Sequence, residues 1–479
     1  MRNRLSLLFC AMLCHTMIFA STWLDYGKYD ISWYKSTDQV FVISTAKELA
    51  GVAYLVNNQY TNFYYKTIIL DADIDLSGNT WIGIGSASYS FRGSFDGQGH
   101  IIKGVKITEN SGQYPYYGFW NYMQDGTIKD LNLDCNVSLN YSDASMPNTY
   151  AGGLAAYASL CSFENCNISV DVTYDRSSTI HTKYKVYLGG MIGSANSVAA
   201  TNCIYTGDIH VYFGRSGTDS EYFQSSSSMT VGGLIANAKE STIKYCGSQA
   251  DYIKVICAGS KNSCNMQTAI GGLIGDTDDR TIIKASYNNT YSIEAVSRGT
   301  STTYLSIGGI TSSAIYYAGS VGGIYNCYST TPNYDVTVRQ SNANVRSGGI
   351  AGNYEPSGSN KYIANFSPSN LTVTTLTHLN LLDGYGGSKT FASYQMRSDA
   401  FLSELNMYPI ANGENYTWIL DGGYPRIKAD GINGINTPTQ HKKELSRVYD
   451  IQGRHATLDT PGMKIVRRED GEAVKIFVK

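Results

Sequence analysis

Three aspartates lie at positions where their side chains could hold a metal ion. Asp71, Asp73 and Asp75 alternate with apolar residues, so in a strand of period two they would share one face. Aligned carboxylate oxygens are the ligands that calcium, a hard cation, prefers. A calcium loop also needs an acidic residue to close it, and Ile82 stands at that position. We therefore interpret the three aspartates as a solvent-facing strand surface, with calcium as the alternative.

The densest group of charged side chains comprises Asp276, Asp278, Asp279 and Arg280. Acids beside a basic residue can act as general acids and bases. These residues follow a glycine pair in a segment typical of a corner loop, so we interpret them as a structural turn. No Ser or Cys stands in a nucleophile-elbow pattern, and the sequence lacks the paired Cys or His spacing of a zinc site. The sequence thus predicts no catalytic residue and no cofactor.

Tyrosine is the remaining residue type with chemical potential, and the chain has 39 of them. Their amphipathic rings can stack on sugars or pack on proteins, although tyrosine also simply suits strand surfaces. Both interpretations stay open. The candidate ligand contacts are Tyr114, Tyr116, Tyr117, Tyr316 and Tyr317.

These side chains need a scaffold, and internal repeats indicate which one. Six glycine pairs, each followed by an aliphatic residue, recur at intervals of 37, 43, 39, 37 and 40 residues. A coil of two or three short strands cannot bury its apolar face alone, so it stacks on copies of itself. A β-sandwich with glycine turns would not explain the near-even spacing. The second glycines of the pairs are Gly153, Gly190, Gly233, Gly272, Gly309 and Gly349.

The repeat predicts an all-β fold, a right-handed parallel β-helix or solenoid. Glycine suits corners where the backbone is left-handed or where the next coil approaches too closely for a Cβ. Cys166, Cys203 and Cys246 occupy one place in the repeat, and Cys327 is a fourth candidate. Because cysteine packs as a small hydrophobe, we expect a stack of buried thiols there in preference to disulfides.

Two short helices are predicted at the ends of the column. Thr45 with Glu48 forms a capping box before apolar residues at helical spacing. This pattern predicts a helix over about 46–57 that covers the first coil. A second short helix is expected from Ser398 to Leu405.

The remaining segments bear on location and partners. Residues 1–20 have a basic head, a short apolar run and a small residue, Ala20, the pattern of a secretory signal peptide cleaved near Ala20. No later apolar run reaches the roughly 20 residues of a membrane-spanning helix. The net charge of −2 and the lack of a basic run argue against nucleic acid as a partner.

The sequence resembles the exported GLUG-repeat β-helix proteins of Bacteroidota type. The resemblance rests on segments 43–50, 70–76, 81–85 and 91–97, on the glycine repeats, and on Trp418–Pro425, which looks like the usual last coil of that family. It implies a β-helix over 21–428. Gly83 departs from the family pattern, which usually has proline there. GLUG repeats also occur beside catalytic domains in immunoglobulin-A-cleaving proteases, but the repeat is not the catalytic part.

The C-terminal segment 447–479 resembles the sorting domain of type IX secretion, although Lys464 stands where that family usually has tyrosine. Glycines at 453, 462 and 471 suggest turns between three strands of a small β-sandwich-like module, and 429–446 reads as a linker. The resemblance implies the outer-membrane secretion machinery as a partner and a secreted or cell-surface location.

Together these features predict an exported surface scaffold, adhesive or ligand-binding, that recognises a glycan or a host protein. The alternative is a polysaccharide-processing enzyme, a lyase or hydrolase, on the same β-helix. A surface where acids and Arg or Lys converge would favour the enzyme, and a tyrosine-rich face would favour the binder.

Overall fold

The structure is a computed structural model. It describes residues 21–109, 115–141, 148–176, 184–213, 227–257, 266–297, 303–316, 319–338, 344–354, 361–369, 372–374, 382–383, 388–421, 423–429, 447–450, 462–467 and 473–478. The chain forms two compact units, Met1–Ile427 and Lys428–Lys479. Their boundary lies one residue before the expected end of the β-helix at 428. In the part of the chain that the structure describes, no helix combines the length and the apolar character needed to cross a membrane.

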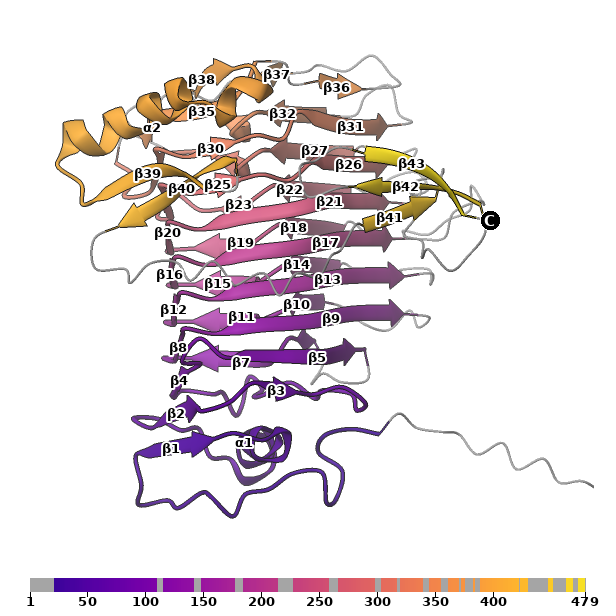
Figure 1. Cartoon of the computed structure of the whole chain (residues 1–479), viewed down its shortest axis with the longest axis vertical. Coiled ribbons are helices and arrows are strands. Elements are labelled where there is room, and N and C mark those ends of the chain that lie inside the picture. Colours follow the sequence, from indigo (N-terminus) through magenta and orange to yellow (C-terminus); the bar gives the residue numbers. More distant parts are fainter. Residues whose placement is uncertain are drawn as a thin grey trace, which may run out of the picture. The chain divides into compact units, whose positions relative to one another are not determined.

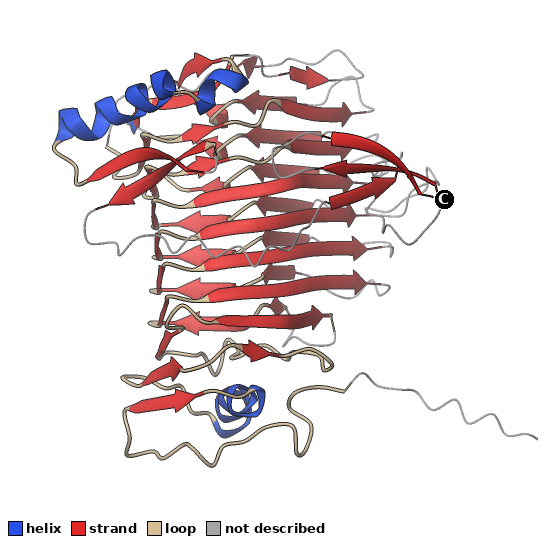
Figure 2. Cartoon of the chain, viewed as in Figure 1, coloured by secondary structure: helices blue, strands red, loops and turns tan. Residues whose placement is uncertain are grey.

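The first unit repeats a coil of four strands, where the sequence suggested two or three. One coil runs through β10 (Asn148–Gly152), β11 (Ala155–Ser159), β12 (Ser162–Glu164) and β13 (Asn167–Arg176). Each strand pairs in parallel with its equivalent in the next coil. Four parallel sheets therefore run side by side along the unit (Figures 1 and 2).

The sheets are numbered here in the order in which one coil passes through them. Besides β10, sheet 1 contains β6 (Tyr116–Tyr117), β14 (Tyr184–Gly189), β18 (Ser227–Gly232), β22 (Met266–Gly271), β27 (Thr303–Gly308), β32 (Asn344–Gly348) and β37 (Leu382–Asp383). Besides β11, sheet 2 contains β7 (Trp120–Gln124), β15 (Ile192–Asn196), β19 (Ile235–Lys239), β23 (Ile274–Thr277), β28 (Thr311–Ala314) and β33 (Ala351–Tyr354).

The other two sheets begin nearer the N-terminus. Besides β12, sheet 3 contains β1 (Val40–Ile43), β2 (Thr67–Leu70), β4 (Ser94–Asp96), β8 (Thr127–Lys129), β16 (Ala199–Thr201), β20 (Thr242–Lys244), β24 (Ile282–Lys284), β29 (Gly323–Tyr325) and β34 (Tyr362–Ile363). Besides β13, sheet 4 contains β3 (Ile74–Asp75), β5 (Ile101–Thr108), β9 (Asn132–Tyr141), β17 (Ile204–Phe213), β21 (Gly247–Cys257), β25 (Tyr287–Asn288), β26 (Ser292–Ser297), β30 (Tyr328–Ser329), β31 (Asn333–Val338), β35 (Asn365–Pro368), β36 (Thr372–Thr374) and β38 (Ser388–Phe391).

The glycine pairs keep the coils in register. Gly152 pairs with Gly189, and the same pairing continues through the first glycines of the later pairs as far as Gly348. Parallel strands joined by such crossovers are right-handed in about 98% of cases. The unit is the right-handed parallel β-helix that the repeat predicts.

The corner glycines are required by close approach and not by a left-handed backbone. A Cβ on Gly190 would lie 2.3 Å from the carbonyl oxygen of Gly233, one coil away. Positive φ angles occur instead at another corner, between sheets 3 and 4, at Asn165 (53°), Asn202 (54°) and Asn326 (52°). Asparagine tolerates this conformation better than most residues. Its side chain also links coils here: the Asn202 side-chain amide donates to the Asn165 side-chain oxygen at 2.8 Å.

The cysteine stack, defined as Cys166, Cys203 and Cys246, follows these left-handed corners into the core. All three are free and fully buried, and the Cys203 amide donates to the Cys246 Sγ at 3.5 Å. Cys327 is also free and buried. The expectation of buried thiols is confirmed for these four cysteines.

The predicted N-terminal cap is present as α1 (Ala46–Gln59). The Glu48 amide donates to the Thr45 Oγ1 at 3.2 Å, and the Thr45 amide donates to the Glu48 carboxylate at 3.0 Å. Leu49, Val52 and Leu55 are fully buried in the common core. The helix lies at the end of the unit next to β1 (Figure 1), as expected.

The C-terminal part of the first unit departs from expectation. The short helix expected at Ser398–Leu405 continues as α2 (Asp399–Asn412), after a turn of 3₁₀ helix, η2 (Ser393–Arg397). The segment expected to be the last coil forms β39 (Tyr416–Asp421) and β40 (Tyr424–Ala429), which pair with each other and not with the four sheets. That expectation is therefore wrong.

The two strands are held against a corner of the column by Asn326. Its side-chain oxygen accepts hydrogen bonds from the Trp418 indole at 2.7 Å and the Tyr416 hydroxyl at 2.9 Å, and its amide donates to the Leu405 carbonyl at 3.0 Å. Asn326 is fully buried, so its polar atoms need these partners.

The second unit holds three antiparallel strands, β41 (Arg447–Asp450), β42 (Gly462–Arg467) and β43 (Ala473–Val478). They form a single sheet, whereas a sandwich-like module was expected. Gly462 begins β42 and does not form a turn; Gly453 and Gly471 lie outside the described residues.

Candidate ligand-binding face

The three aspartates considered for calcium do not share a strand face. β2 ends at Leu70 and β3 begins at Ile74, so Asp71 and Asp73 lie in the connection between the two strands. Asp73 accepts a hydrogen bond from the Ile101 amide at 3.1 Å and contacts the His100 ring at 3.0 Å. Asp75 accepts from the Ser77 amide at 2.8 Å. The carboxylates of Asp73 and Asp75 serve separate local contacts. Within the described ranges, no group of three His, Cys, Asp or Glu side chains is placed to hold a metal.

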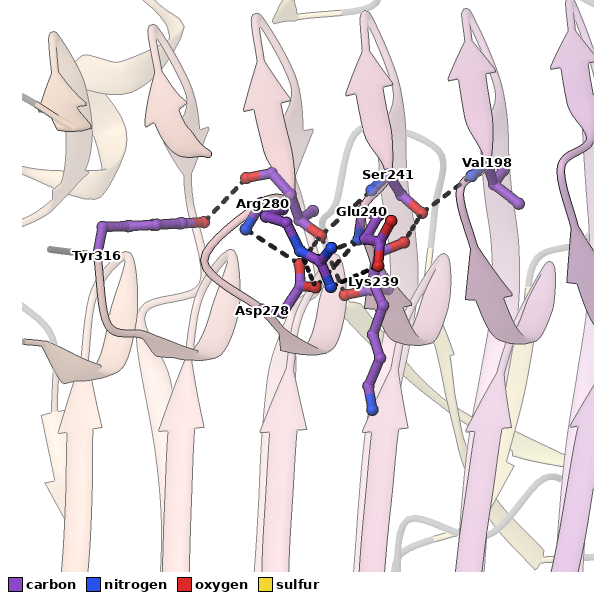
Figure 3. A network of polar contacts seen from close by, with 9 residues as sticks. Val198, Lys239, Glu240, Ser241, Asp278, Arg280 and Tyr316 are labelled. Carbon is purple, nitrogen blue, oxygen red and sulfur yellow. Dashed lines mark hydrogen bonds and ion pairs between the residues drawn. The ribbon is translucent and has the colours of Figure 1, made fainter. Parts of the chain in front are cut away.

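The charged group at 276–280 splits in the structure. Asp278 accepts from the Glu240 amide at 3.0 Å and from the Thr281 hydroxyl at 2.7 Å, while Arg280 pairs with the Glu240 carboxylate (Figure 3). These contacts join the turns of two neighbouring coils, which agrees with a structural turn. Asp276 lies apart from them, on β23.

The tyrosines selected from the sequence as ligand contacts differ in their exposure. Tyr117 and Tyr316 are fully buried, so the expectation that they contact a ligand is wrong; both point into the β-helix, where the apolar ring stabilises the core. Tyr114 and Tyr317 lie outside the described residues. Tyr116 is half-buried on the outer surface of β6.

Tyr116 belongs to a larger group that the sequence analysis missed. Strand pairing aligns Tyr116 with Tyr150 and Tyr150 with Tyr187 on sheet 1, and it aligns Tyr122 with Tyr157 on sheet 2. All five side chains are half-buried. We call these five residues the tyrosine face.

Ring contacts connect the two rows of the tyrosine face. Tyr116 stacks on Tyr150 and Tyr150 on Tyr187, with ring centroids 5.2 Å and 5.1 Å apart. Tyr122 stacks on Tyr157 at 4.6 Å. Across the corner, Tyr116 meets Tyr122 edge to face at 5.1 Å. Offset and edge-to-face contacts of this kind stabilise aromatic pairs by about 0.5–1.5 kcal/mol beyond area burial.

The corner between sheets 1 and 2 brings these outer faces together. Gly152 lies two residues after Tyr150 and so has the same outward direction. A Cβ on Gly152 would lie 2.5 Å from the carbonyl oxygen of Ala155 on the next strand, and at Gly189 the matching distance, to Ile192, is 2.0 Å. The chain therefore bends sharply toward its outer side, and the first glycine of each pair is the residue that permits the bend.

Two phenol groups of the tyrosine face, those of Tyr122 and Tyr187, stay neutral over the physiological range. Burial, followed by the neighbouring phenols, raises the pKa of Tyr122 to about 12. Burial also raises the pKa of Tyr187 to about 12, with smaller contributions from Tyr150 and Asp276. Tyr122 and Tyr187 thus present uncharged rings and hydroxyl groups.

A signal for the face was present in the sequence. Tyr150 and Tyr187 each stand two residues before the first glycine of a pair, and Tyr116 stands two residues before Gly118. Tyr122 and Tyr157 each stand four residues after Gly118 or Gly153. Aligning the repeats on the first glycine groups Tyr116, Tyr150 and Tyr187, but it leaves Tyr122 and Tyr157 one position apart, because Tyr122 lies four residues after Gly118 and Tyr157 five after Gly152.

The comparisons with known proteins give little beyond this geometry. No protein-family model matches the chain, and no curated protein matches it significantly. A solved structure described as "a putative immunoglobulin A1 protease from Bacteroides ovatus" aligns with 82% of this chain and 93% of its own, at 14% sequence identity and a TM-score of 0.33. A similarity of this size carries no argument about function.

Proposed function

We propose that this protein is an exported, non-catalytic β-helix scaffold that binds a glycan through the tyrosine face. The observation that carries the proposal is the face itself: five tyrosines from three successive coils gather at one corner. Aromatic rings offer apolar area to the C–H groups of a sugar, and their hydroxyls offer hydrogen bonds. A rigid β-helix holds such contacts without an ordering cost at binding.

The enzyme alternative has weaker support. Polysaccharide cleavage by paired carboxylates requires two acidic groups on either side of the bond. Among the described residues, Asp276 is an acidic residue on the strand row that continues from Tyr157. Asp278 lies in the neighbouring turn, where its carboxylate bonds the Thr281 hydroxyl. This corner is rich in tyrosine and poor in converging charges, so it favours a binding role over an enzymatic one.

Export is part of the same proposal. Residues 1–20 carry the pattern of a signal peptide, and segment 447–479 resembles a type IX sorting domain, so we propose a secreted or cell-surface protein that uses the outer-membrane machinery. Deleting 447–479 should leave the signal-cleaved protein in the periplasm. Equal amounts of both forms at the surface or in the medium would contradict the sorting role.

Binding is tested on an array of neutral and acidic oligosaccharides. We expect the wild-type chain to retain a subset of them and the double variant Tyr150→Ala, Tyr157→Ala to lose that binding. Tyr212→Ala is the matched control, because Tyr212 is an exposed tyrosine on sheet 4. An assay for released reducing ends on the bound sugars separates a binder from an enzyme: release would refute the non-catalytic role.

A further inference from the structure

The tyrosine face stops abruptly along the column. On sheet 1, the residues aligned after Tyr187 are Thr230, Ala269 and Ser306. On sheet 2, the residues aligned after Tyr157 are Ser194, Asn237 and Asp276. Both rows therefore change from large rings to short side chains at neighbouring coils. We call these six residues the short-residue strip.

Tyr187 is the last ring before the strip. One side of its ring stacks on Tyr150 at 5.1 Å and 18°. In the next coil the aligned residue is Thr230, whose short side chain is almost buried. Among the described residues, Tyr150 is the ring partner of Tyr187. The side of the Tyr187 ring that faces along the column is therefore not covered by another ring.

The strip continues the rows with hydrogen-bonding groups: by strand register, Asn237 lies one coil and Asp276 two coils beyond the coil of Tyr187. The Asn237 amide donates to the Ser194 hydroxyl at 3.2 Å, which turns its carbonyl oxygen away from Ser194. Asp276 follows Asn237 in register. Its carboxylate lies within electrostatic reach of Tyr187, because it contributes to the raised pKa of that phenol. An aromatic ring followed along the column by two oxygen acceptors suits a pyranose, since the C–H groups of the sugar can contact the ring while its hydroxyls donate to the acceptors.

We propose that the tyrosine face ends in a subsite at Tyr187 for one pyranose ring of a neutral hexose chain, with Asn237 and Asp276 accepting hydrogen bonds from its hydroxyl groups. This inference rests on the proposed glycan-binding function. It specifies the ligand class, because the carboxylate of Asp276 would repel a uronate or sulfated sugar at the same place. Two charged groups of opposite sign, Lys239 and Asp278, act on the carboxyl group of Asp276.

The test measures affinities of the full chain for neutral hexose hexamers (gluco-, manno- and galacto-) and for hexauronates, by titration calorimetry. Tyr187→Ala should weaken binding of the neutral hexamer by on the order of tenfold, the upper range for one lost ring contact. Tyr116→Ala, at the opposite end of the same row, is the matched control and should weaken it by less than about threefold. Asp276→Asn should bring the affinity for the hexauronate closer to that for the neutral hexamer.

The outcomes separate this inference from the proposed function. Equal losses in Tyr187→Ala and Tyr116→Ala, or a wild-type preference for hexauronate, would overturn the subsite while leaving glycan binding intact. Failure of the wild-type chain to bind any of these sugars would overturn both. Unchanged thermal midpoints of Tyr187→Ala and Tyr116→Ala show that their losses of affinity arise at the surface and not from unfolding.

Discussion

Adding a single methyl group at Gly190 should destabilise the β-helix. The new Cβ would lie 2.3 Å from the carbonyl oxygen of Gly233 and 2.3 Å from ring carbons of Tyr205. The ring can rotate away, but the carbonyl belongs to the backbone of the next coil. The Gly190 amide also donates to that carbonyl at 2.8 Å, so moving the coils apart weakens a hydrogen bond as well.

The magnitude follows from these two contacts. Overpacking in a tight core costs about 1–3 kcal/mol, and the weakened hydrogen bond adds about 1 kcal/mol. The entropy of unfolding is near 2.1 cal/mol/K per residue, so for roughly 400 residues each kcal/mol lowers the thermal midpoint by about 1 °C. Gly190→Ala should therefore lower it by about 2–5 °C.

Thermal denaturation followed by circular dichroism is the assay. Gly233→Ala should behave like Gly190→Ala, because its Cβ would lie 2.1 Å from the Gly272 carbonyl oxygen. Gly319→Ala is the control, since a Cβ there meets nothing within 4 Å and the backbone needs no positive φ. If all three variants melt at the same temperature, the reasoning about close approach between coils is refuted.

Three further predictions use other parts of the fold. The cysteine stack should resist a thiol reagent in the native protein and react with it after unfolding without a reductant; disulfide-linked peptides in mass spectra would contradict this. Burial raises the pKa of Asp276 to about 6, so the folded state binds the proton more tightly than the unfolded state and loses stability as the pH rises from about 4 to about 6. Asp276→Asn should remove that loss, so its thermal midpoint should exceed that of wild type at pH 7 and equal it near pH 4. The same difference in midpoint between variant and wild type at both pH values would refute this prediction. Asn326→Ala removes the hydrogen bonds to Tyr416 and Trp418, so tryptophan fluorescence should shift to the red, and an unchanged spectrum would show that these bonds do not hold the hairpin.

Sequence reasoning succeeded where one physical demand determines the residue. The close approach of the backbone at the corner between sheets 1 and 2 favours glycine, so the pairs repeat at six successive coils and reveal the period. The capping box at Thr45 and Glu48 is local, and the helix followed from it. The thiols repeat at one inward position of the coil, which Leu131, Ser286 and Asn365 occupy in other coils.

Prediction from the sequence failed where the structure depends on how distant segments of the chain pack together. Trp418 would be a strand residue both in a last coil and in the separate β39–β40 sheet. The buried Asn326, 92 residues earlier, decides between them by accepting a hydrogen bond from the Trp418 indole. The tyrosine face was missed for a related reason. Tyr150 and Tyr157 come from two strands of one coil, and they share a surface because the glycine corner between them bends outward. Tyr117, by contrast, differs from Tyr116 by one position, which in a strand is the difference between surface and core.

The coil period has a consequence for the order of folding. Each coil pairs with the one about 40 residues before it, so the entropy of closing a contact is set by the length of a coil and not by the length of the column. Coils can therefore add one after another onto the end capped by α1. The segment from α2 to β40 follows a different rule, because it bonds residues 79 to 177 positions earlier in the chain. Such distant contacts form slowly, so we expect this segment to dock last, after the coils beneath it are complete.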